Sequence, residues 1–132
     1  MKAFIDGASR GNPGPASTGV QLLDDSGAVL KEHGRTLGVQ TNNVAEYEAL
    51  LDALRLAKDL GATELLVHSD SLLLVKQVQG EYRVKNAGLA LLKAKAAALI
   101  REFSVVKLVH VRRELNKDAD RLANMALDGT PI

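Results

Sequence analysis

Acidic side chains stand at several points where apolar segments end or helices begin. They are Asp6, Glu46, Asp70 and the pair Asp118 and Asp120. The chain has no cysteine and only three histidines, so any bound metal must be held mainly by oxygen, which favours Mg²⁺, Mn²⁺ or Ca²⁺. Carboxylates that converge repel one another, and divalent cations relieve that repulsion. Two such ions about 3.5–4 Å apart can clamp the attacking and leaving oxygens of a phosphodiester.

Two of these acids follow short apolar runs. Asp6 comes after Ala3–Ile5 and precedes a loop rich in Gly, Asn and Pro, so we expect it at the last position of a buried strand. A buried carboxylate there is costly without a cation. The alternative is an ordinary Asp-Gly turn. Asp70 follows the run Leu65–Ser69, and its alternative is an N-cap or first-turn acid of the next helix.

The helical phase of Glu46 distinguishes it from the other acids of its segment. It lies about 200° around the helix from Glu48, on the stripe that should pack against a sheet. The polar side is then formed by Glu48, Asp52, Arg55 and Asp59. A capping box with Asn43 is the alternative for Glu46. Phase does not decide between Asp118 and Asp120 near the start of the last helix, so both remain candidates.

The order of expected elements defines a fold class. Three strands, of which two are joined by a tight hairpin turn, precede alternating helices and strands, which predicts an α/β fold. We expect one domain over residues 1–132, with a mixed sheet and helices on its faces. The expected strands are 3–6, 17–23, 28–37, 64–69 and 104–111, and the expected helices are 41–60, 72–78, 87–101 and 116–127.

Charge and hydropathy restrict the partners. Residues 1–70 carry six Lys/Arg against ten Asp/Glu, whereas residues 71–132 carry eleven against six. A basic C-terminal half suits contact with a polyanion, although ordinary solvated helix faces would give the same count. No segment approaches membrane-spanning length, and the N-terminus lacks the pattern of a signal peptide. We expect a soluble, cytoplasmic, monomeric protein with no membrane partner.

Four segments, taken together and in order, carry a family pattern: Phe4–Gly7 with Gly11–Pro15, Thr41–Glu46, His68–Ser71 and Arg112–Asp120. They resemble the type 1 ribonuclease H family, in its compact bacterial and archaeal form without the basic protrusion. The likeness covers essentially the whole chain and implies a five-stranded sheet, three antiparallel strands followed by two parallel ones, with helices on both faces.

The resemblance assigns roles to individual residues. It implies that Asp6, Glu46, Asp70 and Asp120 are the catalytic metal ligands, which selects Asp120 over Asp118. The implied cofactor is Mg²⁺, with Mn²⁺ as a substitute, and two ions when substrate is bound. It further implies that three amides contact the minor groove of an RNA–DNA hybrid, where amides can read 2′-hydroxyls and base edges. Turn and helix-cap duties are compatible with that role. The amides are Asn12, Asn42 and Asn43.

The chain departs from better-known members in two places. The loop before the last helix has no histidine, so we expect Arg112 or Arg113 to supply positive charge there, without proton shuttling. His110 is expected to be structural or half-buried. The segment Gly80–Gly88 is short, and the chain has no Trp. With fewer phosphate contacts, we expect binding of the hybrid to be weaker and to depend more on low salt.

The activity implied is metal-dependent cleavage of the RNA strand of RNA–DNA hybrids, leaving 5′-phosphate and 3′-hydroxyl ends. Double-stranded RNA is a conceivable second substrate. Two alternatives stay open at this point: a non-catalytic module that binds hybrids or duplexes, and another two-metal nuclease on the same fold. Retention of four acids argues against a mere binder, because clustered negative charge repels phosphates.

Overall fold

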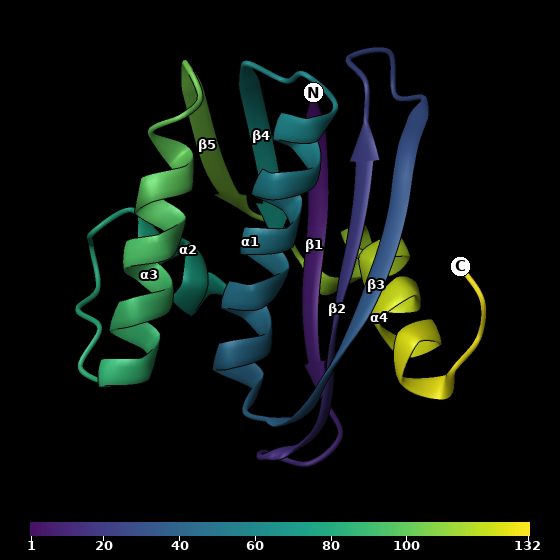
Figure 1. Ribbon diagram of the computed structural model, residues 1–132, viewed down its shortest axis with the longest axis vertical. Helices are drawn as coiled ribbons and strands as arrows, with labels where there is room; N and C mark the ends of the chain where they lie inside the picture. Colours follow the sequence, from purple (N-terminus) through teal and green to yellow (C-terminus); the bar gives the residue numbers. More distant parts are fainter.

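The computed structural model describes residues 1–132, and its centre is a five-stranded mixed sheet in the order β3-β2-β1-β4-β5 (Figure 1). Strand β1 pairs antiparallel with β2, and β2 with β3, whereas β1–β4 and β4–β5 are parallel. The predicted α/β class and strand arrangement are therefore confirmed. The elements are β1 (Lys2–Ser9), β2 (Gly14–Leu23), β3 (Val29–Gln40), α1 (Asn42–Asp59), β4 (Glu64–Ser69), α2 (Leu72–Val78), α3 (Ala87–Ile100), β5 (Val105–His110), the 3₁₀ turn η1 (Arg113–Leu115) and α4 (Lys117–Asp128).

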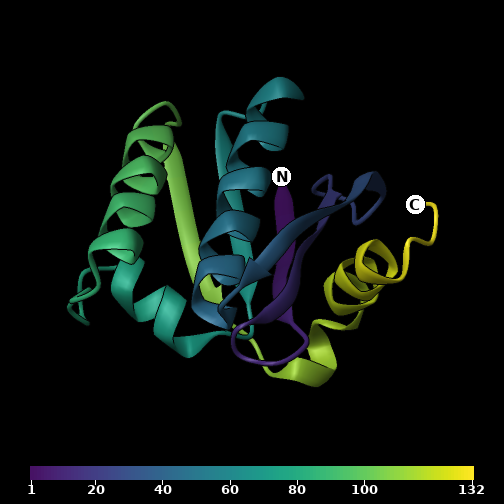
Figure 2. The ribbon, with the colours of Figure 1, turned by 60° about the horizontal axis from the view of Figure 1, so that its bottom comes forward.

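Helices cover both faces of the sheet. Helices α1 and α3 lie on one face, and α4 lies on the other, against β1, β2 and β3 (Figures 1 and 2). Two glycines of the central strands allow this close packing. A Cβ at Gly7 would lie 2.2 Å from the backbone of Ala45 in α1, and one at Gly19 would lie 2.1 Å from the Ala119 carbonyl oxygen in α4. None of the helices is long and apolar enough to cross a membrane.

The main core lies between the sheet and α1. Ile5 of β1, Val20 of β2 and Val67 of β4 are fully buried, as are Leu50 and Leu54 on the inner stripe of α1. Burial of each such side chain contributes about 1.5–3 kcal/mol relative to exposure. The core therefore fixes α1 against β1 and β4, the elements that carry three of the predicted acids.

The strands near the N-terminus are longer than the sequence predicted. Strand β1 does not end at Asp6 but continues to Ser9, because its pairing with β2 extends to the partners Ser9 and Ala16. Pairing with β4, by contrast, ends at the partners Ile5 and Ser69. Asp6 thus lies just beyond the end of the parallel ladder while its strand continues. The later elements match their predicted ranges within one or two residues.

One acid of the expected polar side of α1 is buried instead. The Asp52 carboxylate accepts hydrogen bonds from Thr18 (2.7 Å) and from two nitrogens of Arg35 (3.0 and 3.1 Å), and it lies 3.3 Å from His33 Nε2. Burial alone raises the pKa of Asp52, but the hydrogen bonds from His33, Arg35 and Thr18 outweigh it and hold the pKa below its ordinary value. This ion pair fastens α1 to β2 and β3.

Candidate active site

Asp6 presents a carboxylate from the central strand and is 7% exposed. Burial raises its pKa to about 8, with further contributions from the carboxylates of Asp70 and Asp120, while Arg113 opposes the shift. The Asp-Gly turn considered from the sequence is wrong, because Asp6 and Gly7 are both inside β1. Asp6 is therefore a buried acid held among other acids, without a hydrogen-bonded cation.

Glu46 reaches the same place from the first turns of α1. The helix is capped by Thr41, whose hydroxyl accepts the backbone N–H of Val44 at 3.3 Å, so the capping box with Asn43 is not formed. As its helical phase predicted, Glu46 points inward and is 9% exposed. Burial raises its pKa well above the ordinary value, and the charges of Asp6 and Asp70 raise it further. Its Oε2 atom is buried with no hydrogen-bond partner.

Asp70 follows β4 and is free of capping duty. The N-cap of α2 is Ser71, whose hydroxyl accepts the backbone N–H of Leu74 at 3.2 Å. One carboxylate oxygen from each of Asp6, Glu46 and Asp70 lies within 4.8 Å of the other two. The structure therefore brings three of the four predicted acids into one cluster, although they come from β1, from α1 and from the position after β4.

Asp120 borders this cluster from α4. It is exposed, lines the same cleft as the other three acids and contributes to the raised pKa of Asp6. Asn124 donates a hydrogen bond to its backbone oxygen at 3.0 Å. Asp118, its rival in the sequence, instead lies 3.3 Å from Arg121 in an exposed ion pair. Asp120 therefore lies beside the acid cluster, whereas Asp118 is engaged elsewhere.

The chemistry of the cluster fits a divalent cation. Several buried or half-buried carboxylates face one another, an oxygen of Glu46 has no protein donor, and Arg113 is the cation that lowers the pKa of both Asp6 and Glu46. An all-oxygen donor set of this kind suits Mg²⁺ or Mn²⁺, which keep several waters and bind through a few carboxylates. The cleft around the acids has a volume of about 400 Å³ and is mostly polar.

The predicted amides lie on the rim of the cleft. Asn42 and Asn43, the first residues of α1, line it together with the acids. Asn12 does not line it, but its side-chain oxygen accepts the backbone N–H of Asn42 at 3.1 Å. Asn12 therefore connects the loop between β1 and β2 to the start of α1, and all three amides are exposed.

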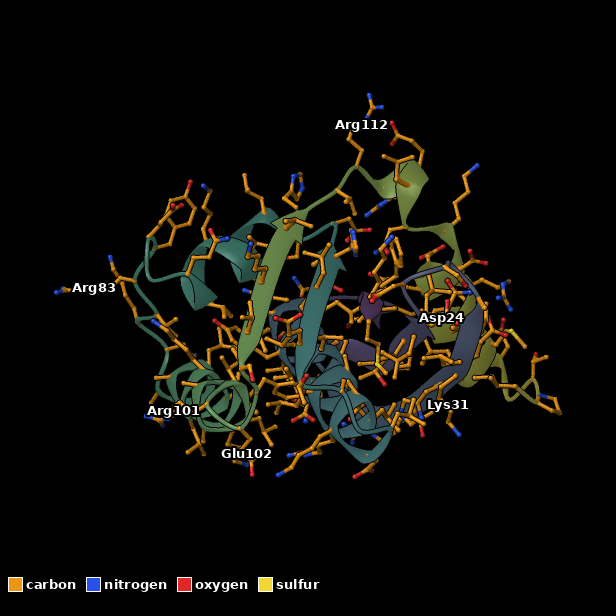
Figure 3. All side chains as sticks on the ribbon, turned by 90° about the horizontal axis from the view of Figure 1, so that it is seen from above. Asp24, Lys31, Arg83, Arg101, Glu102 and Arg112 are labelled. Carbon is orange, nitrogen blue, oxygen red and sulfur yellow. The ribbon has the colours of Figure 1, made fainter.

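The two arginines before α4 are not equivalent. Arg113 lines the cleft, whereas Arg112 projects away from the molecule, as Figure 3 shows, and its Nε lies 3.3 Å from Glu114. Residues 113–115 form a 3₁₀ turn that was not predicted, and this turn directs consecutive side chains differently. His110 is exposed at the end of β5, so its expected structural or half-buried position is wrong.

Three polar residues in or near the site were not predicted from the sequence. Ser9 and Ser71 line the cleft, and Asn116 is buried beneath the start of α4. Ser71 carries a local signal, since it stands directly before a helix and serves as its N-cap. No local pattern marks Ser9, whose place follows from the unpredicted extension of β1.

The α/β fold and its cluster of carboxylates are typical of metal-dependent nucleases, and the match to a family model agrees with this class. The model, described as reverse transcriptase-like, matches residues 4–126, and the chain belongs to that family. Within it, the similarities below place the chain among the type 1 ribonucleases H, as the sequence motifs predicted.

The chain is similar to ribonuclease HI of Halobacterium salinarum, with 43% identity over 128 residues, 97% of this chain and 64% of that protein. The crystal structure of that archaeal ribonuclease H1 superposes with a TM-score of 0.95 and 42% identity, covering 98% of each chain. LC11 ribonuclease H1, solved in complex with an RNA/DNA hybrid, gives a TM-score of 0.93 at 42% identity, covering 97% of this chain and 96% of that one.

A Mycobacterium tuberculosis protein described as bifunctional is 47% identical over 131 residues, which is 97% of this chain and 36% of that protein. The chain thus spans less than two thirds of the length of these curated relatives. The likeness to them covers one part of their architecture.

Proposed function

We propose that this protein is a metal-dependent endoribonuclease that cleaves the RNA strand of RNA–DNA hybrids. The observation that carries the proposal is the acid cluster, in which Asp6, Glu46 and Asp70 place carboxylate oxygens within 4.8 Å of one another beside Asp120. The similarity of this chain to LC11 ribonuclease H1, which was solved with an RNA/DNA hybrid, supports a hybrid as the substrate. We further propose that residues 1–132 act as a single domain.

In this proposal the four acids hold Mg²⁺, for which Mn²⁺ can substitute. Bound there with substrate, two ions supply the activation of water and the stabilisation of the departing 3′ oxygen. Asp6, Glu46 and Asp70 would hold the ions together with Asp120 from α4, and Glu46 shares the first turns of α1 with Asn42 and Asn43. The products would be 5′-phosphate and 3′-hydroxyl ends.

The rim of the cleft provides the means of substrate recognition. Asn42 and Asn43 present exposed amides beside the acids, where donors and acceptors can meet the 2′-hydroxyls of an A-like minor groove. Asn12 supports Asn42 through its hydrogen bond and extends the polar rim. Arg113 supplies positive charge inside the cleft, and we assign it, rather than Arg112, to the phosphate.

A second groove supports contact with a polyanion away from the acids. It has a volume of about 560 Å³ and lies between the loop after α2 and the outer side of α3. Tyr82, Arg83 and Lys93 line it, and Arg83 extends outward from the loop (Figure 3). Glu81 also lines the groove, but two cations beside an aromatic side chain suit contact with a nucleic-acid backbone.

The proposal is tested with a panel of labelled substrates: RNA–DNA hybrid, double-stranded RNA, duplex DNA and a four-way junction. We expect cleavage of the RNA strand of the hybrid in Mg²⁺ or Mn²⁺, and none in EDTA. Asp70→Asn should lower the rate on the order of 10²–10³-fold or more, because it removes a charge at the reacting centre. Hybrid cleavage that survives EDTA or this substitution contradicts the mechanism.

The same panel separates the alternatives. Hybrid binding without turnover would identify a binding module, and preferential cleavage of the junction or of duplex DNA would identify another nuclease on this fold. Cleavage of double-stranded RNA beside the hybrid would extend the substrate range. The monomeric state and cytoplasmic location expected from the sequence stay predictions, which sizing chromatography and cell fractionation can check.

A further inference from the structure

A buried asparagine connects the first acid-bearing element to the last. Asn116 is 1% exposed and lies between the 3₁₀ turn of Arg113 and helix α4. Its side-chain amide donates a hydrogen bond of 2.8 Å to the backbone oxygen of Ile5. Ile5 directly precedes Asp6. Asn116 stands one helical turn before Asp120, and the backbone N–H of Asp120 donates to the backbone carbonyl oxygen of Asn116 at 3.2 Å.

The position of this hydrogen bond is set by the sheet. The parallel pairing of β1 with β4 ends at Ile5 and Ser69, so the strand offers a backbone acceptor where the ladder stops. A buried carbonyl group needs a donor, and the amide of Asn116 supplies one. The contact therefore fastens the N-terminus of α4 to β1 at the residue next to the acid cluster.

The usual reasons for an asparagine at this position do not apply. Its side chain makes no capping bond to α4, although it is the N-cap residue. Its Oδ1 atom is buried without a hydrogen-bond partner, which is an unfavourable arrangement that an apolar residue would avoid. What Asn116 provides is the hydrogen bond to Ile5, which fixes the start of α4 relative to β1.

We propose that Asn116 is a positioning residue that holds Asp120 at the correct distance from Asp6 for metal binding. This inference rests on the proposed function, and Asn116 acts through Asp120 rather than by touching metal or substrate. Loss of the bond lets the start of α4 move relative to β1, so Asp120 no longer completes the set of ligands. Groups that orient metal ligands in this way typically account for about 10–100-fold in metal affinity or activity.

Two substitutions separate positioning from packing. Asn116→Asp keeps the volume and is an equally good residue type for a helix N-cap, yet its carboxylate cannot donate to Ile5. Asn116→Ala removes the whole amide. Asn86→Ala is the matched control, because Asn86 caps α3 far from the acids by accepting the backbone N–H of Leu89. Asn116→Ser serves in place of either variant that fails to fold.

The first measurement needs no nucleic acid: the rise in Tm as Mg²⁺ is added to metal-free protein. We expect the half-saturating Mg²⁺ concentration to increase about 10–100-fold in both Asn116 variants and to stay unchanged in Asn86→Ala. The second is steady-state cleavage of the hybrid, where kcat should fall by a similar factor at fixed Mg²⁺ while KM for the hybrid changes little.

A double-mutant cycle provides the decisive comparison. If Asn116 acts through Asp120, Asp120→Ala should cost much less in an Asn116→Ala background than in the wild type. Additive effects, or an Asn116→Asp variant with wild-type Mg²⁺ dependence and kcat, overturn the inference. Should the wild type fail to cleave the hybrid, the proposed function falls, and the Mg²⁺-dependent Tm series still decides the role of Asn116.

Discussion

At the scale of single residues, the acid cluster is unfavourable for the metal-free fold. Asp6 and Glu46 lose water on burial, and their charges repel each other and Asp70, so their pKa values are raised. Arg113 offsets only part of this repulsion. The acids that suit the cleft to a cation therefore lower the stability of the metal-free protein, and a sequence optimised for stability alone would not contain them.

Stability of the metal-free protein should depend on pH in a direction opposite to that of an ordinary salt-bridged acid. The pKa of Asp6 is about 8 in the folded state against 3.8 ordinarily, so the folded chain holds this proton more tightly. Protonation of Asp6 therefore stabilises the folded state fully below about pH 4, and the free energy of unfolding falls as the pH rises from there toward 8. Urea unfolding in EDTA at several pH values measures this contribution.

The matched variant for that series is Asp70→Asn, which removes one repelling charge. We expect it to raise the Tm of metal-free protein at pH 8, to have less effect at pH 5, and to weaken the stabilisation by Mg²⁺. An Asp70→Asn variant that is less stable than the wild type in EDTA at pH 8 would show that repulsion is not the dominant effect.

The neighbouring arginines should respond differently to truncation. Arg113→Ala removes the cation that lowers the pKa of Asp6 and Glu46, so we expect kcat/KM for the hybrid to fall about 10-fold or more. Arg112→Ala removes an exposed side chain paired with Glu114 and should change kcat/KM by less than about threefold. Equal effects of the two substitutions would contradict the assignment of Arg113 to the cleft.

At the scale of elements, local patterns predicted which segments fold and which way α1 faces. The 3.6-residue period was sufficient to aim Glu46 inward, because its direction follows from helix geometry alone. The end of β1 was not predictable in the same way, because its last residues are held by pairing with β2, far along the chain. The burial of Asp52 likewise depends on Arg35 in another strand.

Close contact between α4 and the sheet makes Gly19 sensitive to substitution. Gly19→Ala would place a Cβ 2.1 Å from the Ala119 carbonyl oxygen, which forces α4 away from β2 and should cost about 1–3 kcal/mol or more. Gly88→Ala in α3 would meet only the Oδ1 atom of Asn86, at 3.2 Å, and should change the stability much less. Thermal unfolding of the two variants, in EDTA and in Mg²⁺, measures the difference.

At the scale of the whole molecule, positive charge is sparse around the cleft. Arg113 lies inside it, and Arg83 and Lys93 line a separate groove, while the chain has no Trp to grip a base. We therefore expect weak affinity for the hybrid and a shallow dependence on salt, because Kd rises by only about one power of ten for each tenfold rise in salt per phosphate contact.

That dependence is measured by titrating an uncleaved hybrid in Ca²⁺ at several salt concentrations. Arg83→Ala should reduce the slope of log Kd against log salt by about one if Arg83 contacts a phosphate. An unchanged slope would remove the groove after α2 from the binding surface and leave recognition to the rim of the acid cleft.

The sequence indicated which acids lie near one another better than it indicated how the residues around them are arranged. The motifs indicated all four acids, and the structure gathers three of them closely while Asp120 stands at the border. What the sequence could not give was the role of each neighbour. Arg112 and Arg113 look alike in the chain, and a 3₁₀ turn distinguishes them; Asn116 has no local signature, and its burial depends on contact with β1.

The packing of α4 against β1 has a consequence for biosynthesis. Within residues 1–132 these are the last and the first elements, and Asp6 and Asp120 belong to them. A ribosome releases β1 long before α4, so the growing polypeptide can pair its early strands but cannot complete the ligand set. Contacts between such distant segments also form slowly. If the proposed function holds, a growing chain that has not yet formed α4 should bind metal and cleave hybrids poorly.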